Sequence, residues 1–119
     1  MSAPMQTRDQ KMAKFASDRI KEVTNGAKFK SIARSFPSLI MANGLGQALA
    51  FLRAKDEPWH RQLYKFISKW VSAAAYGTNG DDVLPLIMAN DSKKYNRAMQ
   101  EAMSISSWLK RFAEAEFKD

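Results

Sequence analysis

The chain has no cysteine and only one histidine among its 119 residues. Without thiols it cannot form a disulfide, a thiolate zinc site, an iron–sulfur cluster or a cysteine nucleophile. The longest nearly apolar run, Leu39–Leu52, carries Asn43 and Gln47 and is too short to span a bilayer, and the polar N-terminus lacks the apolar segment of an export signal. These absences predict a protein outside the membrane and fit a cytoplasmic, reducing location.

Strand signals are also scarce, because no run alternates apolar and polar residues and β-branched residues are few and scattered. Hydrophobic residues make up 45% of the chain, with three Trp, seven Phe and seven Met, which is enough apolar mass for a core without a metal or disulfide. The sequence therefore predicts an all-α protein, a compact single-domain bundle of about five or six helices over residues 1–119.

Helical spacing of apolar residues predicts a first helix over Pro4–Val23, stopped by Asn25-Gly26. A short second helix should end near Phe36, because proline disfavours the helical conformation of the residue before it. Pro37 should then occupy the first turn of a third helix.

Two glycines interrupt the apolar segment that follows. Each glycine costs about 1 kcal/mol relative to alanine inside a helix, so Asn43-Gly44 and Gly46 predict a break, with a resumed helix over Leu45–Ala54. The missing side chains also leave room for another helix or a partner's backbone.

The next helix should start at Asp56-Glu57-Pro58, with carboxylates and proline at its N-terminal end. We expect Tyr64 and Tyr76 to be exposed. The residues expected to form its apolar face are Trp59, Leu63, Phe66, Ile67, Trp70 and Ala74.

Two further helices are predicted near the C-terminus. Asp81 or Asp82 can cap a short helix that contains Pro85, and Asp91 or Ser92 can cap the last helix. The residues expected to form a bundle-facing seam on the last helix are Tyr95, Ala98, Ala102, Ile105, Leu109 and Phe112.

The net charge of +7 is unevenly distributed: residues 1–36 contain eight basic and three acidic residues, whereas residues 77–119 contain six and seven. A polyanion is the natural partner of such a surface, since each Lys or Arg placed at a phosphate releases counterions.

Arg61, Lys65 and Lys69 lie four residues apart, opposite the Trp59 face and without an acid among them. Four helical residues rise about 6 Å, comparable to the phosphate spacing of an extended single strand. The hypothesis is that this row follows an RNA backbone; the spacing by itself favours a solvated helix face, and the RNA hypothesis takes its support from the family resemblance given below. Two further basic clusters consist of Lys28, Lys30 and Arg34, which we add to the candidate RNA-binding residues, and of Lys93, Lys94 and Arg97, whose arginine has Glu101 four residues later.

Other chemistries are less well supported. His60 with Asp56 and Glu57 is better explained as the exposed start of a helix than as a metal site. The serines Ser104, Ser106 and Ser107 lack a base on their own helix. Gly44-Leu45-Gly46 does not follow a strand and is not a dinucleotide fingerprint. We predict no catalytic residue, metal, cofactor or small-molecule substrate.

Two segments, Phe36–Phe51 and Trp108–Ala115, together with Tyr95, Arg97 and Ala98, resemble the small helical subunit of type III-B CRISPR RNA-guided effector complexes, the Cmr complexes. The most specific parts are Asn43-Gly44-Leu45-Gly46 and Leu109–Ala113. We assign structural roles to Asn43, Gly44, Gly46, Trp108 and Phe112.

The resemblance implies a non-catalytic subunit present in several copies, which stacks head to tail beside the guide-RNA filament and helps hold single-stranded target RNA. Its partners would be other effector subunits, copies of itself, guide RNA and target RNA. Head-to-tail stacking needs two different complementary surfaces, and the basic first two thirds and the slightly acidic last third offer one pairing. We expect the isolated protein to be mostly monomeric. Two rivals remain: a helical DNA-binding regulator, which needs a base-reading helix, and a small helical enzyme, which needs a catalytic set.

Overall fold

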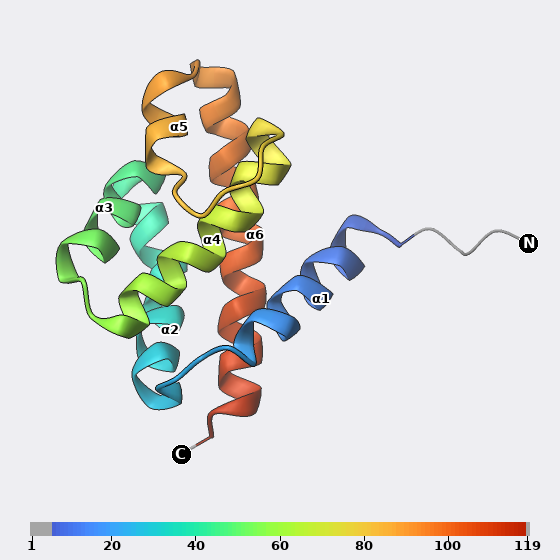
Figure 1. Ribbon diagram of the computed structural model, residues 1–119, viewed down its shortest axis with the longest axis vertical. Helices are drawn as coiled ribbons and strands as arrows, with labels where there is room; N and C mark the ends of the chain where they lie inside the picture. The colour runs from blue at the N-terminus through green and yellow to red at the C-terminus, as the bar shows by residue number, and fades with distance from the viewer. Residues whose placement is uncertain (1–5, 119) are drawn as a thin grey trace, which may run out of the picture.

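The longest helix, α6 (Ser92–Glu116), runs the length of the molecule, and α1, α2 and α4 all pack against it (Figure 1). The computed structural model describes residues 6–118, and within this range it contains six helices and no strand. The all-α prediction is confirmed. None of the described helices is long and apolar enough to cross a membrane.

Helix α1 (Arg8–Ile20) begins at a capping box, in which the Thr7 hydroxyl accepts from the Gln10 N–H at 3.1 Å. The predicted start at Pro4, and Met5 of the predicted stripe, lie outside the described residues. The helix ends at Ile20, three residues before the predicted Val23.

Helix α2 (Gly26–Asn43) corrects two predictions. Asn25 does not stop α1; its side chain caps the start of α2 by accepting from the Lys28 N–H at 3.1 Å. The helix then continues through Pro37 instead of ending at Phe36. Proline removes one backbone hydrogen bond, but Phe36 and Ile40 on either side are fully buried, so tertiary packing outweighs the local preference.

The predicted break at Asn43-Gly44 is confirmed. Gly44 has φ 85° and ψ 162°, a conformation restricted to glycine, and it separates α2 from α3 (Leu45–Lys55). The Tyr95 hydroxyl of α6 approaches this corner and accepts from the Gly46 N–H at 3.3 Å. The space that the two glycines leave is therefore used by another helix of the same chain.

Helix α4 (Pro58–Tyr76) begins at the predicted proline, and Leu63, Phe66 and Ile67 are fully buried as expected. The expectation that Tyr64 and Tyr76 are exposed is wrong, since they are only 8% and 9% exposed. The loop after α4 folds back over Tyr64, whose hydroxyl donates to Asp82 and accepts from the Leu84 N–H at 3.4 Å.

Helix α5 (Leu84–Ala89) has no side-chain cap, so the prediction of a cap by Asp81 or Asp82 is wrong; Asp82 instead accepts from Tyr64. Helix α6 is capped as predicted, with the Asp91 carboxylate accepting from the Lys94 N–H at 3.0 Å. The centre of the predicted α6 seam is fully buried: Ala98, Ala102, Ile105 and Leu109.

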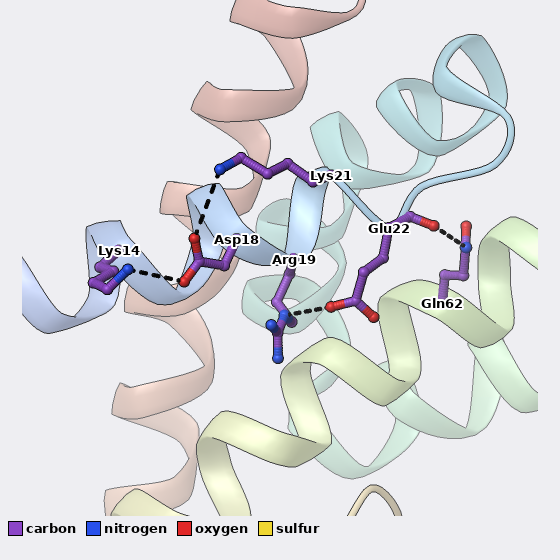
Figure 2. A network of polar contacts seen from close by, with 6 residues as sticks. All are labelled: Lys14, Asp18, Arg19, Lys21, Glu22 and Gln62. Atoms are coloured by element: carbon purple, nitrogen blue, oxygen red, sulfur yellow. Dashed lines mark hydrogen bonds and ion pairs between the residues drawn. The ribbon is translucent and has the colours of Figure 1, made fainter.

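Polar contacts hold the end of α1 against α4 (Figure 2). Arg19 Nε lies 2.7 Å from a Glu22 carboxylate oxygen, and the Gln62 amide of α4 donates to the Glu22 carbonyl at 3.0 Å. On the outer side of α1, the carboxylate of Asp18 lies within ion-pair distance of Lys14 and Lys21. The Glu22 carbonyl thus attaches the α1–α2 connection to α4 through the hydrogen bond from Gln62.

Candidate nucleic-acid interface

Every arginine of the chain forms an ion pair within the molecule. The chain has seven arginines, and all of them have a carboxylate oxygen within 4.0 Å. The pairs are Arg8–Glu101, Arg19–Glu22, Arg34–Glu114, Arg53–Asp82, Arg61–Asp56, Arg97–Glu101 and Arg111–Glu114.

Three of these pairs join the basic first two thirds of the chain to the acidic last third. They are Arg8–Glu101, Arg34–Glu114 and Arg53–Asp82. Three of the seven acidic residues of the last third are therefore already paired with arginines of the same molecule, and fewer acids remain to attract the basic part of a neighbouring copy.

Glu101 is the most deeply placed of these acids, with a side chain 2% exposed. It accepts hydrogen bonds from Arg8 and from Trp70 Nε1, the latter at 3.0 Å, and Arg97 lies 3.5 Å away. A buried carboxylate requires such partners, so this group joins α1, α4 and α6.

At the surface, Arg34 Nε donates to Glu114 at 3.2 Å. This hydrogen bond is the main reason why the pKa of Glu114 is lowered from its ordinary value, and the nearby charge of Arg111 lowers it further. Glu114 is thus a shared acceptor for two arginines of different helices.

The lysines behave differently. Lys14 and Lys21 pair with Asp18, and Lys30 is buried, only 6% exposed. The other nine form no ion pair with any residue between 6 and 118. They are Lys11, Lys28, Lys55, Lys65, Lys69, Lys93, Lys94, Lys110 and Lys118.

The structure separates the six predicted RNA-binding residues into two groups. Arg61 donates to the backbone carbonyl of Asp56 and lies 3.1 Å from its carboxylate, Arg34 is held by Glu114, and Lys30 is buried. Lys28 and Lys65 are exposed and Lys69 is half-buried, all three without an ion pair in residues 6–118.

One member of the α2 cluster, Lys28, contacts the first turn of α4. The Lys28 ammonium of α2 lies over the Trp59 ring at 5.8 Å, so Lys28 stands at the start of the helix that carries Lys65 and Lys69. In the third cluster, Lys93 and Lys94 are exposed, and Arg97 forms the predicted pair with Glu101.

A cleft of about 490 Å³, lined mostly by charged residues, includes Arg61 and Lys65 in its wall. Its wall includes Tyr64, whose pKa is raised to about 12 by burial and by the hydrogen bond to Asp82. The Tyr64 hydroxyl is therefore neutral at physiological pH. The remaining lining residues are Leu52, Arg53, Asp56, Asp81 and Asp82, so the cleft carries both signs of charge.

His60 lies half-buried against the rings of Phe51 and Trp59. Across residues 6–118, no group of three or more His, Cys, Asp or Glu side chains is arranged to hold a metal ion. Sequence reasoning missed the grouping of Phe51 and Lys55 with His60, because they come from a different helix and only the α3–α4 turn brings them together.

The residues assigned structural roles lie at helix contacts. Gly44 and Gly46 face the Tyr95 hydroxyl, Asn43 ends α2, and the Trp108 and Phe112 rings stack on each other at 5.9 Å and pack partly buried on the core.

Comparison with known proteins places these features in a family. The family model described as CRISPR-associated protein (Cas_Cmr5) matches residues 8–116. A protein named "CRISPR system Cmr subunit Cmr5" from Thermus thermophilus is 25% identical over 126 residues, covering 93% of this chain and 96% of that protein. The X-ray crystal structure of a CRISPR-associated Cmr5 family protein, also from Thermus thermophilus, has a TM-score of 0.77 and 26% identity, covering 93% of this chain and 97% of that one. Because the family model matches nearly all of the described residues, the chain belongs to the Cas_Cmr5 family.

Proposed function

We propose that this chain is a non-catalytic subunit of a CRISPR Cmr effector complex in antiviral defence, where several copies stack along the guide-RNA filament and help hold single-stranded target RNA. Family membership and the similar protein named as a Cmr subunit support the place in the complex. The lack of cysteine and the single histidine support the absence of catalysis.

The observation that carries the RNA-binding part is a set of three lysines that form no ion pair in residues 6–118, which we call the lysine row: Lys65 and Lys69 on the side of α4 away from Trp59, and Lys28 of α2, which lies over Trp59 at the start of α4. An ammonium without a carboxylate partner can approach a phosphate without first breaking an ion pair. Each such contact releases counterions from the nucleic acid, whereas an arginine already held by a carboxylate gains less.

For the contact between copies we propose an apolar groove of about 730 Å³ between the end of α2 and the first half of α6. Met41 is 78% exposed at its edge, and methionine side chains adapt to irregular partner surfaces. The second copy is the proposed occupant, since three of the seven acids of the last third that could attract the basic part of a neighbour are already paired within one molecule, which leaves more of the contact to apolar surface. The lining residues are Ile40, Met41, Gly44, Met99, Gln100, Met103 and Ser104.

Affinity purification of the tagged protein from its host tests the proposal. We expect a multi-subunit complex with several copies of this chain and short RNAs that share a repeat-derived 5′ end. Recovery of the protein alone, or with duplex DNA, would contradict it and favour the DNA-binding regulator.

A matched pair of variants then tests the copy contact in the same purification. Met41→Glu places a charge in the groove and should lower the number of copies per complex. Met88→Glu places the same charge on α5, at a methionine that is 75% exposed and not among the groove-lining residues, and should leave the copy number unchanged.

A further inference from the structure

Three aromatic rings lie side by side where α3 turns into α4. The Phe51 and His60 ring centroids are 6.3 Å apart, and those of His60 and Trp59 are 6.0 Å apart. All three side chains are half-buried, so each ring is anchored in the bundle and also reaches the surface. We call these three residues the ring platform.

A lysine lies over each end of the ring platform. The Lys55 ammonium is 5.5 Å from the Phe51 ring centroid, and that of Lys28 is 5.8 Å from the Trp59 centroid. Both lysines are exposed. An exposed ammonium can lie over a ring only where that face of the ring is open to solvent, so the positions of Lys28 and Lys55 identify the accessible faces of Trp59 and Phe51.

The central ring contributes as an aromatic surface and not as a charge. Burial lowers the pKa of His60 more than the Glu57 charge raises it, so the imidazole is neutral at physiological pH. Its Nδ1 is buried and has no hydrogen-bond partner among the described residues. The Phe51 and His60 rings meet edge to face at 78° and the His60 and Trp59 rings are tilted by 42°, so the ring platform offers separate ring faces, with a cation over each outer ring.

We propose that bases of single-stranded RNA stack on the ring platform while Lys28 and Lys55 move aside to contact the flanking phosphates. This inference rests on the proposed function and adds a base-contacting site to the backbone contacts of the lysine row. Stacking a base on a protein ring strengthens binding about fivefold to 150-fold. An exposed cation–π pair contributes about twofold to fivefold. Because stacking contributes more than the cation–π contact, the base displaces the lysine from the ring. The displaced ammonium then contacts the phosphate attached to that base.

A nucleic acid is a better occupant than a protein, because lysine is depleted in the centre of protein interfaces, where charge must be desolvated. Adjacent rings with a cation over each outer ring match unpaired bases whose phosphates lie to either side. Unpaired bases expose the π-faces that such a surface requires, whereas bases within a duplex stack on each other.

The test compares two strands of equal length and charge: a 20-nucleotide single-stranded RNA and an abasic ribose-phosphate strand. Both are titrated against the full-length protein at one salt concentration. Trp59→Leu and Phe51→Leu should each weaken RNA binding about fivefold or more and change binding of the abasic strand less than about twofold. Trp59→Phe, which keeps a ring, should retain most of the RNA affinity. Trp108→Leu is the matched control on α6 and should alter neither strand.

Thermal unfolding of each variant, followed by circular dichroism, verifies that it folds, and ultraviolet crosslinking of the wild-type protein should map to a peptide containing residues 51–60. Equal RNA binding by wild type and both leucine variants would overturn the ring platform but not RNA binding. The ring platform would also be overturned if Trp59→Leu weakened binding of both strands equally. It would be overturned likewise if Trp59→Leu reduced only the incorporation of the protein into the complex and left RNA binding unchanged. Failure of the wild-type protein to bind either strand would overturn both proposals.

Discussion

The side of the molecule where α1 meets α6 and the corner where α3 turns into α4 carry positive charge for different purposes. On the first side, Arg8 and Arg97 converge on the buried Glu101. At the corner, Lys28 and Lys55 lie over aromatic rings without an ion pair in the described chain. Net charge alone therefore does not measure how much positive charge is free to meet a partner; the type of cation and its partners within the molecule do.

The different use of arginine and lysine follows from the chemistry of their side chains. A guanidinium is planar and weakly hydrated, and it satisfies a carboxylate with several fixed donors, which suits contacts between helices. An ammonium is a strongly hydrated point charge on a flexible stem, which suits a solvent-exposed contact with a phosphate. Three of the seven arginines connect distant elements of the fold and the other four pair locally, whereas the lysine row forms no ion pair in residues 6–118.

The largest expected effect comes from removing both cations from the buried acid. Arg8→Gln with Arg97→Gln leaves Glu101 uncompensated, and we expect a loss of about 3 kcal/mol in the free energy of unfolding, measured with urea. Arg61→Gln is the control, because its partner Asp56 is exposed, and it should cost less than about 0.5 kcal/mol. Equal losses in the free energy of unfolding would show that an arginine pair with the buried Glu101 contributes no more to stability than a pair with the exposed Asp56.

A smaller effect is expected at the α3–α4 corner, where Tyr64 and Arg53 share Asp82. Tyr64→Phe removes a hydroxyl with two hydrogen bonds and should cost about 1 kcal/mol. Tyr76→Phe is the matched control, because the buried Tyr76 hydroxyl has no partner in residues 6–118, and it should be neutral or stabilising. If urea unfolding shows the reverse order, Tyr64 does not hold the loop over this corner.

The smallest effect is a pH dependence at the surface pair. Because Arg34 lowers the pKa of Glu114 below 4.5, the pair stabilises the fold above that pH, and this contribution is lost as the pH falls through the lowered pKa. The stability difference between wild type and Arg34→Gln, followed by urea unfolding from pH 7 to pH 3, should therefore shrink toward the acid end. For Lys93→Gln, which breaks no ion pair in the described chain, the difference should stay flat; a flat difference for Arg34→Gln as well would contradict the coupling.

Most of the fold could be predicted from helical periodicity and local end signals. Gly44 and Pro58 mark their helix ends because their backbone chemistry leaves few alternatives. The errors arose where distant packing decided the outcome: α2 continues through Pro37 because residues on both sides are buried, and Tyr64 is buried because a later loop covers it.

The candidate site could be predicted only in part. The spacing of Lys65 and Lys69 made them candidates in the sequence, and that assignment stays a prediction; the spacing could not tell that Arg61 is held by Asp56 or that Lys30 is buried. Nor could it place Phe51 beside His60, since that contact depends on the angle between two helices.

The proposal that the lysine row and not the arginines contacts RNA is tested by the salt dependence of single-stranded RNA binding in two triple variants of equal charge. Lys28→Gln, Lys65→Gln and Lys69→Gln together should reduce the slope of log affinity against log salt by about 2, since each phosphate contact on a single strand contributes about 0.7. Arg34→Gln, Arg61→Gln and Arg111→Gln together should leave that slope nearly unchanged. Equal reductions in the two variants, or a reduction only in the arginine variant, would contradict the assignment of RNA binding to the lysines.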